Sequence, residues 1–154
     1  MSKIQVTNIN DLSDNASLVT QNGGIKTDKL TGKTTAGSIL VTGEGNSTTT
    51  NLQQGLAKAW VKFTQVGTHT AADSFNLTSL TDNGTGNSTV TIANDLANAN
   101  GPISVTSDNG SNFNNGAMGR MTAAGTASVR CSATTSAAGS DKAYTQVIIC
   151  GDLA

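Results

Sequence analysis

The sequence predicts an all-β protein: an antiparallel β-sandwich, jelly-roll-like or Ig-like, preceded by an extended or partner-docked N-terminal arm. Thr, Gly, Asn and Ser account for 72 of the 154 residues, whereas Asp, Glu, Lys and Arg make up 12% and proline occurs once. Short runs of alternating apolar and polar residues recur between clusters of Asn, Asp and Gly, as is typical of strands joined by turns. In the first 54 residues no helical periodicity persists beyond one turn.

Residues 1–54 differ from the rest and are expected to form the arm. Their best strand candidate is 38–42, which is closed by a turn at 43–46. This segment has too few large apolar residues to build a core alone, so we expect it to dock onto another surface. The stretch 48–56 is interpreted either as a capped turn of helix or as a loop that leads into the domain.

The domain itself is expected to span residues 55–154. In the run 59–63, Ala59, Val61 and Phe63 share one face, which is the alternation of a strand. The clearest hairpin signal is Asp-Asn-Gly-Thr-Gly at 82–86, because such turns need residues that adopt positive φ. Further strands are expected at 74–81, 88–92, 103–107, 126–131 and 145–150, with 93–98 as a short helix or a turn.

The sequence offers little catalytic chemistry. His69 is the one histidine, lies between two threonines and is expected to be an ordinary surface residue. Glu44 is the one glutamate, and Asp82 and Asp108 each precede Asn-Gly, where capping of a turn explains them. We therefore expect no enzyme, no catalytic residue, no cofactor and no metal site, with calcium at the two Asp-Asn pairs as a minor alternative.

Charge and hydropathy exclude further classes. A net charge of −1 at a pI near 5.6 is too small to attract nucleic acid or an anionic membrane. No apolar run approaches the roughly 18 residues that span a bilayer, and the N-terminus lacks the apolar segment of a secretory signal. Cys131 and Cys150 are expected to be free, mostly buried thiols, with a disulfide between neighbouring strands as the alternative.

An ordered series of motifs gives a resemblance to a known family. The series consists of Gly-Leu-Ala-Lys-Ala-Trp-Val-Lys-Phe at 55–63, Asp-Ser-Phe-Asn-Leu at 73–77, the turn at 82–86 and a hydrophobic strand closed by Gly-Asp at 148–152. It resembles a recurrent module in structural proteins of tailed phages, especially phages of marine cyanobacteria. The resemblance covers most of residues 35–154 and implies a non-enzymatic particle component, a tail fibre or an accessory structural protein.

On this basis we expect a phage virion surface protein, made in the host cytoplasm and assembled on the particle surface. It would be an accessory knob, a capsid decoration or a short fibre, attached through its N-terminal segment to the major capsid protein or a tail component. Because large apolar residues are few, we expect other chains to complete the core, with a homotrimer favoured among homo-oligomers. Leu52, Leu56 and Trp60 are the candidate interface residues, and ordinary core packing is their equal alternative.

The alternative function is a glycan- or receptor-binding module of a tail fibre that acts in host adsorption. Such a module would present exposed aromatic rings beside amide and carboxylate groups. In the loop 108–119, Asn112, Phe113 and Asn114 are the candidate ligand-facing residues. A host surface glycan is then a partner, whereas neither nucleic acid nor an inserted membrane is expected as one.

Overall fold

The protein is described here from a computed structural model, which covers residues 29–30, 39–43, 48–110, 115–133 and 138–154. The chain divides into two packing units, residues 1–31 and 32–154. Within the described ranges there is no helix, and every strand pairs antiparallel to its neighbour. The all-β prediction is therefore confirmed.

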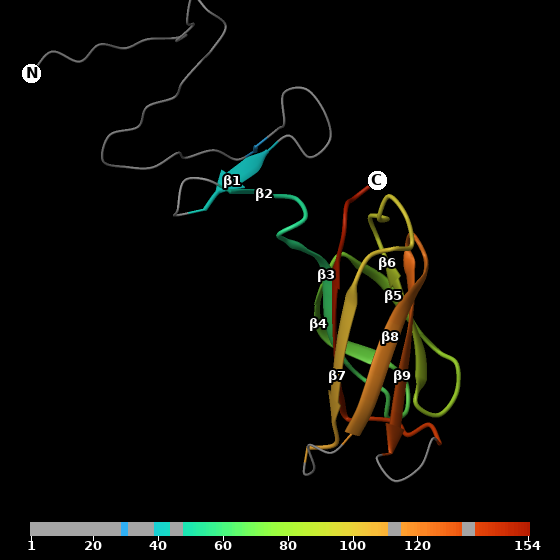
Figure 1. Cartoon of the computed structure of the whole chain (residues 1–154). Coiled ribbons are helices and arrows are strands. Elements are labelled where there is room, and N and C mark those ends of the chain that lie inside the picture. Colours follow the sequence, from blue (N-terminus) through green and yellow to red (C-terminus); the bar gives the residue numbers. More distant parts are fainter. Residues whose placement is uncertain (1–28, 31–38, 44–47, 111–114, 134–137) are drawn as a thin grey trace, which may run out of the picture. The chain divides into compact units, whose positions relative to one another are not determined.

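Eight strands form two four-stranded sheets, of order β4-β3-β10-β7 and β5-β6-β9-β8 (Figure 1). A separate two-stranded hairpin, β1–β2, precedes them in the sequence. The bounds of the strands are β1 Leu40–Thr42, β2 Thr49–Asn51, β3 Ala57–Thr64, β4 Thr70–Phe75, β5 Leu77–Asp82, β6 Asn87–Ile92, β7 Ile103–Asp108, β8 Asn115–Ala123, β9 Thr126–Ala133 and β10 Tyr144–Cys150.

The two sheets share one hydrophobic core. Strands β3, β6, β9 and β10 each alternate between buried and more exposed residues, so one side of each strand faces the other sheet. Phe63 is the largest apolar side chain in this core and is 1% exposed. The predicted inward face of 59–63 is thus confirmed. The core consists of Ala59, Val61, Phe63, Val90, Ile92, Leu96, Ala127, Val129, Cys131, Val147 and Ile149.

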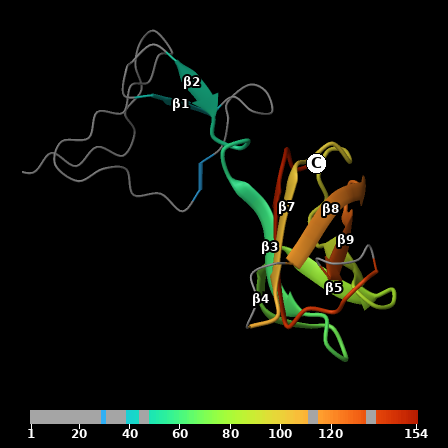
Figure 2. The same cartoon turned by 60° about the horizontal axis from the view of Figure 1, so that its bottom comes forward.

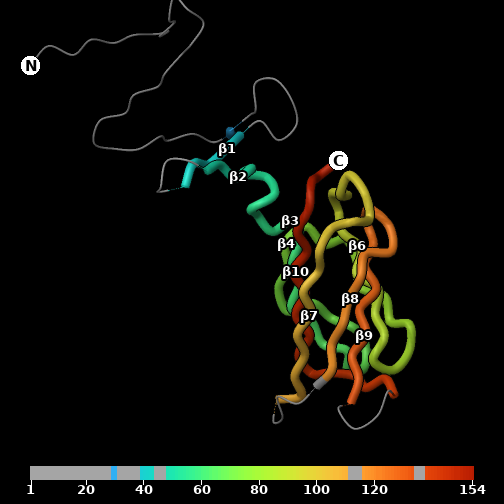
Figure 3. The backbone as a smooth tube through the Cα atoms, in the orientation of Figure 1, coloured from blue at the N-terminus to red at the C-terminus, as the bar shows by residue number. Residues whose placement is uncertain are grey.

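The chain enters and leaves the two sheets at the same end. Cys150, the last residue of β10, pairs with Ala57, the first residue of β3. We call this the entry end, and the opposite one the loop end. Strands β3, β5, β7 and β9 end at the loop end, and β4, β6, β8 and β10 begin there (Figure 3).

Strands β6 to β10 follow a Greek-key path. Strands β7, β8 and β9 are consecutive neighbours, and β7 and β8 lie side by side at the border between the two sheets (Figures 1 and 2). Strand β10 then returns to pair with β7, which is the order of a Greek key. Strand β6 pairs with β9 and is followed by β7, so it forms a second, overlapping Greek key.

The predicted strand 74–81 is wrong as a single element. It is broken at Asn76, which has φ of 57° and separates β4 in one sheet from β5 in the other. Asparagine tolerates this left-handed conformation. Its side-chain Nδ2 donates to the carbonyl oxygen of Lys58 at 2.9 Å, and its Oδ1 accepts from the Asn94 N–H at 2.7 Å. This locked corner lets one short segment supply an edge strand to each sheet.

Strand β8 was not predicted, because its sequence is rich in glycine. Gly119 lies against β7, where an added Cβ would come within 2.6 Å of Val105 Cγ2 and 2.9 Å of Ile103 Cδ1. Glycine in a strand often marks such a close approach. The residue that lowers the strand propensity is therefore the one that lets β7 and β8 pack.

Neither of the two possible short helices is formed. Residues 49–51 belong to β2, and a turn follows in which Asn51 Oδ1 accepts from the Gln54 N–H at 3.2 Å. Residues 93–98 bend without helical hydrogen bonding, and Leu96 makes an isolated bridge with Leu153. The first stretch is thus a short strand followed by a turn, and the second is a non-helical connection, which agrees with the turn that the sequence offered as the alternative to a helix.

The hairpin predicted at 82–86 joins β5 to β6, as expected. Gly84 and Gly86 have φ of 100° and 69°, and the Gly84 N–H donates to Asp82 Oδ1 at 2.8 Å. The predicted turn cap is thus confirmed for Asp82. It stays a prediction for Asp108, whose turn runs into residues outside the described ranges and whose Oδ1 is buried without a hydrogen-bond partner.

Candidate functional site

The outer face of the sheet β4-β3-β10-β7, which we call the sheet face, carries an exposed apolar row. Trp60 in β3 is directly opposite Phe75 in β4 on one side and Ile148 in β10 on the other. The three residues are 37%, 53% and 50% exposed, respectively. Opposed side chains on one face of an antiparallel sheet lie about 5 Å apart at Cβ, so they form a continuous strip.

A polar row runs beside this apolar row. Two residues further along each strand, Lys62 lies opposite Asp73 in β4 and Gln146 in β10, and Gln146 lies opposite Thr106 in β7. All four of these residues are exposed to solvent. The Lys62 Nζ also lies 5.5 Å from the centroid of the Tyr144 ring, a cation–π contact. The sheet face thus combines stacking surface with both hydrogen-bond donors and acceptors.

The structure places the three predicted interface residues differently from one another. Trp60 is at the centre of the apolar row. Leu56 immediately precedes β3 and is 53% exposed, whereas Leu52 is half-buried in the turn after β2. The predicted ligand-facing residues Asn112, Phe113 and Asn114 lie outside the described residues.

The sequence analysis missed the partners of Trp60 on this face. Phe75 and Ile148 join Trp60 through strand pairing between residues that are far apart in the chain. One signal was available: Ile148 follows Gln146 on the side of β10 opposite the buried Val147 and Ile149. Alternation along β10 therefore predicts that Ile148 points outward. Only the register of the strand pairing shows which residues lie beside it on the sheet face.

The β1–β2 hairpin is a second exposed apolar element. Each strand has three residues, and Leu40 pairs with Asn51 and Val41 with Thr50. Leu40 is 56% exposed and Val41 is 50% exposed. A two-stranded hairpin alone is marginally stable in water, and here neither large apolar side chain is covered.

The prediction that His69 is an ordinary surface residue is wrong. Its side chain is 2% exposed, and its ring centroid lies 6.1 Å from that of Phe63, a core residue. The loop after β3 turns inward, because the buried Gln65 is held by hydrogen bonds to the β9–β10 connection and to Ser88. The imidazole of His69 belongs to the same loop and also points toward the interior.

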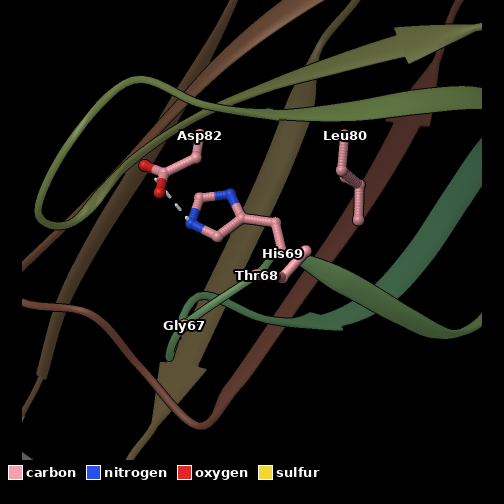
Figure 4. Close-up of a pocket in the computed structure, with 5 residues that line it drawn as sticks. All are labelled: Gly67, Thr68, His69, Leu80 and Asp82. Carbon is pink, nitrogen blue, oxygen red and sulfur yellow. Dashed lines mark ion pairs between the residues drawn. The ribbon is translucent and has the colours of Figure 1, made fainter.

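The imidazole of His69 lies in a pocket between the two sheets at the loop end. The pocket has a volume of about 580 Å³ and is lined by Gly67, Thr68, His69, Leu80 and Asp82. Figure 4 shows the ring and the Asp82 carboxylate directed toward one another. The His69 Nε2 lies 3.6 Å from Asp82 Oδ1, and both ring nitrogens are buried without a hydrogen-bond partner.

The two cysteines are free thiols, as the sequence analysis predicted. Burial raises the pKa of the Cys131 thiol above its ordinary value, although its contact with the Thr145 hydroxyl at 3.9 Å acts in the opposite direction. Cys150 is half-buried beside a smaller pocket, of about 290 Å³, at the entry end.

At pH 8 we therefore expect a thiol reagent to label one cysteine per native chain, Cys150, and two per unfolded chain. We also expect stability to fall as the pH rises past the ordinary thiol pKa of about 8.5, because only the unfolded Cys131 then ionises readily. Counting modified thiols by mass spectrometry, with and without denaturant, checks the first result. Labelling of both cysteines in the native chain would contradict it.

Two further findings concern the described residues as a whole. No three or more His, Cys, Asp and Glu side chains among them are grouped so as to hold a metal ion. None of the described segments forms a helix that is long and apolar enough to span a bilayer.

Comparison of the chain with protein-family models, with curated proteins and with solved structures gave no match.

Proposed function

We propose that this chain is a non-enzymatic accessory structural protein of a phage particle, a knob, decoration or short fibre. Its residues 1–54 anchor it to the major capsid protein or a tail component, and its two-sheet domain, residues 55–154, projects from the surface. The sequence motifs that resemble tailed-phage structural proteins supply the class, since they run from 55–63 through the β5–β6 hairpin to the end of β10.

The observation that carries this proposal is the uncovered β1–β2 hairpin. Leu40 and Val41 expose half or more of their surface in an element too small to be stable alone. Covering these two side chains by a particle protein removes apolar surface from water, which stabilises both the hairpin and the attachment. The arm joins the sheets at Ala57, so the loop end is the part of the domain farthest from that junction.

Incorporation into particles tests the proposal. In the phage that encodes the chain, we expect the Leu40→Asp, Val41→Asp double variant to fall at least tenfold in copies per particle, because charge on the hairpin opposes docking. A Val66→Asp variant serves as the matched control, since Val66 is 59% exposed in a loop of the domain. Absence of the wild-type protein from purified particles, or equal copies of both variants, would refute the proposal.

For the finer fold, we propose a jelly-roll-like sandwich rather than an Ig-like one. Eight strands in two sheets with two overlapping Greek keys support the jelly-roll relation. In the Ig order the second strand pairs with the fifth, whereas here the second strand of the domain, β4, is an edge strand.

The sheet face favours glycan binding as a second candidate function. The ring of Trp60 supplies an apolar platform, and Asp73, Lys62 and Gln146 supply donors and acceptors for sugar hydroxyls beside it. Loss of glycan-array binding in Trp60→Ala, with retention in Met118→Ala, would support this function; Met118 is 67% exposed in the other sheet. If light scattering instead shows that Trp60→Ala lowers the molar mass from that of a homotrimer to that of a monomer, the sheet face is the contact between subunits.

A further inference from the structure

We propose that His69 and Asp82 form a binding site for a divalent transition-metal ion of the zinc type at the loop end. The two side chains come from different sheets, since His69 precedes β4 and Asp82 ends β5. An ion held between them would join the two sheets at their open edge. This inference does not depend on the proposed attachment to a phage particle.

The distance between the two donor atoms suits a shared ion better than a hydrogen bond. His69 Nε2 and Asp82 Oδ1 are 3.6 Å apart, which is beyond hydrogen-bond range. Zinc binds imidazole nitrogen and carboxylate oxygen at about 2.0–2.2 Å. Two such bonds to atoms this far apart meet at an angle of about 120°, and a small closing movement brings it to the tetrahedral angle.

The imidazole of His69 is buried and has no hydrogen-bond partner, which also favours a bound ion. Its side chain is 98% buried, on the 2% exposure given above, and neither ring nitrogen has a hydrogen-bond partner. Leaving a buried polar atom unpaired is unfavourable, and coordination of an ion satisfies such an atom. Neutral imidazole is the commonest metal ligand, and this ring points toward a carboxylate (Figure 4).

The carboxylate is held in place and is reachable from solvent. Asp82 Oδ1 accepts a hydrogen bond from the Gly84 N–H at 2.8 Å, within the β5–β6 turn. The Asp82 side chain is 54% exposed, so an ion has a route from water to the pair. The pocket of about 580 Å³ beside the pair has room for water molecules as further ligands.

The imidazole selects the class of ion. Carboxylate and water alone suit Mg²⁺ or Ca²⁺, whereas one imidazole shifts the preference toward Zn²⁺, Co²⁺ or Ni²⁺.

Titration of the purified full chain with Co²⁺, whose visible spectrum reports its ligands, tests the proposal. We expect one Co²⁺ per chain, displaced by Zn²⁺, with a rise of about 5 °C in the thermal midpoint at saturating metal. Both effects are expected to disappear in Asp82→Asn, whose amide oxygen still accepts from Gly84, and in His69→Gln.

Two controls separate this site from others. Asp73→Asn removes an exposed carboxylate from the sheet face, and Cys150→Ser removes the half-buried thiol at the entry end; both are expected to bind Co²⁺ like the wild type. If wild-type chain binds no Co²⁺, or if Asp82→Asn and His69→Gln bind it unchanged, the site does not exist. A thiolate absorption band lost in Cys150→Ser would assign the ion to the cysteine instead.

Discussion

Replacing Gly86 with alanine is expected to lower the free energy of unfolding by at least about 3 kcal/mol. Gly86 has φ of 69° in the β5–β6 turn, and a Cβ there would overlap the Cys131 carbonyl oxygen and the Ser140 nitrogen. Both are backbone atoms. The backbone at Cys131 is also hydrogen-bonded to Gly86 itself, because the Cys131 N–H donates to the Gly86 carbonyl oxygen at 2.7 Å. The hairpin cannot move away without breaking that bond. Urea unfolding measures the loss.

Gly67 provides the matched control, because it has the same φ of 69° but no atom within 4 Å of an added Cβ. Gly67→Ala is therefore expected to show only the cost of the left-handed conformation, about 1–2 kcal/mol. The difference between the two variants measures the close contact at Gly86. Equal losses would mean that the β5–β6 turn does not pack against the β9–β10 connection.

Replacing Gln65 with methionine is expected to cost about 3 kcal/mol, although the side-chain volume is nearly unchanged. The buried Gln65 Nε2 donates to Ser88 Oγ at 2.8 Å, and its Oε1 accepts from the Lys142 N–H at 3.2 Å. Methionine leaves both of these partners buried without that bond. The amide connects the end of β3, the start of β6 and the β9–β10 connection, so the loop end is expected to loosen first.

Gln54→Met tests whether any glutamine would behave in this way. Gln54 is exposed, and its Nε2 donates to Asp152 Oδ2 at 3.1 Å. We expect a change below about 0.5 kcal/mol, as for most surface substitutions. Hydrogen exchange of the two variants locates the effect, and unchanged protection around Ser88 in Gln65→Met would contradict the proposed role of the amide.

Local sequence patterns predicted those parts of the fold that depend on neighbours in the chain. The alternation in 59–63 identified the inward side of β3, and Asp-Asn-Gly-Thr-Gly identified the β5–β6 turn. Tertiary packing decided the parts that were missed. The sequence around Gly119 is typical of a loop, and only the close packing of β7 against this glycine explains why it lies in a strand. The corner at Asn76 depends on hydrogen bonds to Lys58 and Asn94.

The candidate sites show the same division. Alternation alone placed Trp60 on the side of β3 opposite the core. Its neighbour Ile148 comes from the other end of the domain, and only the β3–β10 register brings the two together. Nothing in the polar sequence around His69 indicates a buried ring, because its neighbours Phe63 and Asp82 meet it only in the folded domain.

The pairing of β3 with β10 has a consequence for the order in which the chain folds. The first strand of the domain is held between β4 and the last strand, and β10 in turn covers the inner edge of β7. During synthesis this sheet has a gap at its centre until residues 144–150 have left the ribosome. Contacts so distant in sequence form slowly. Folding of this sheet is thus expected to wait until β10 has been synthesised, and removal of β10 is expected to leave two separated strand edges exposed to aggregation.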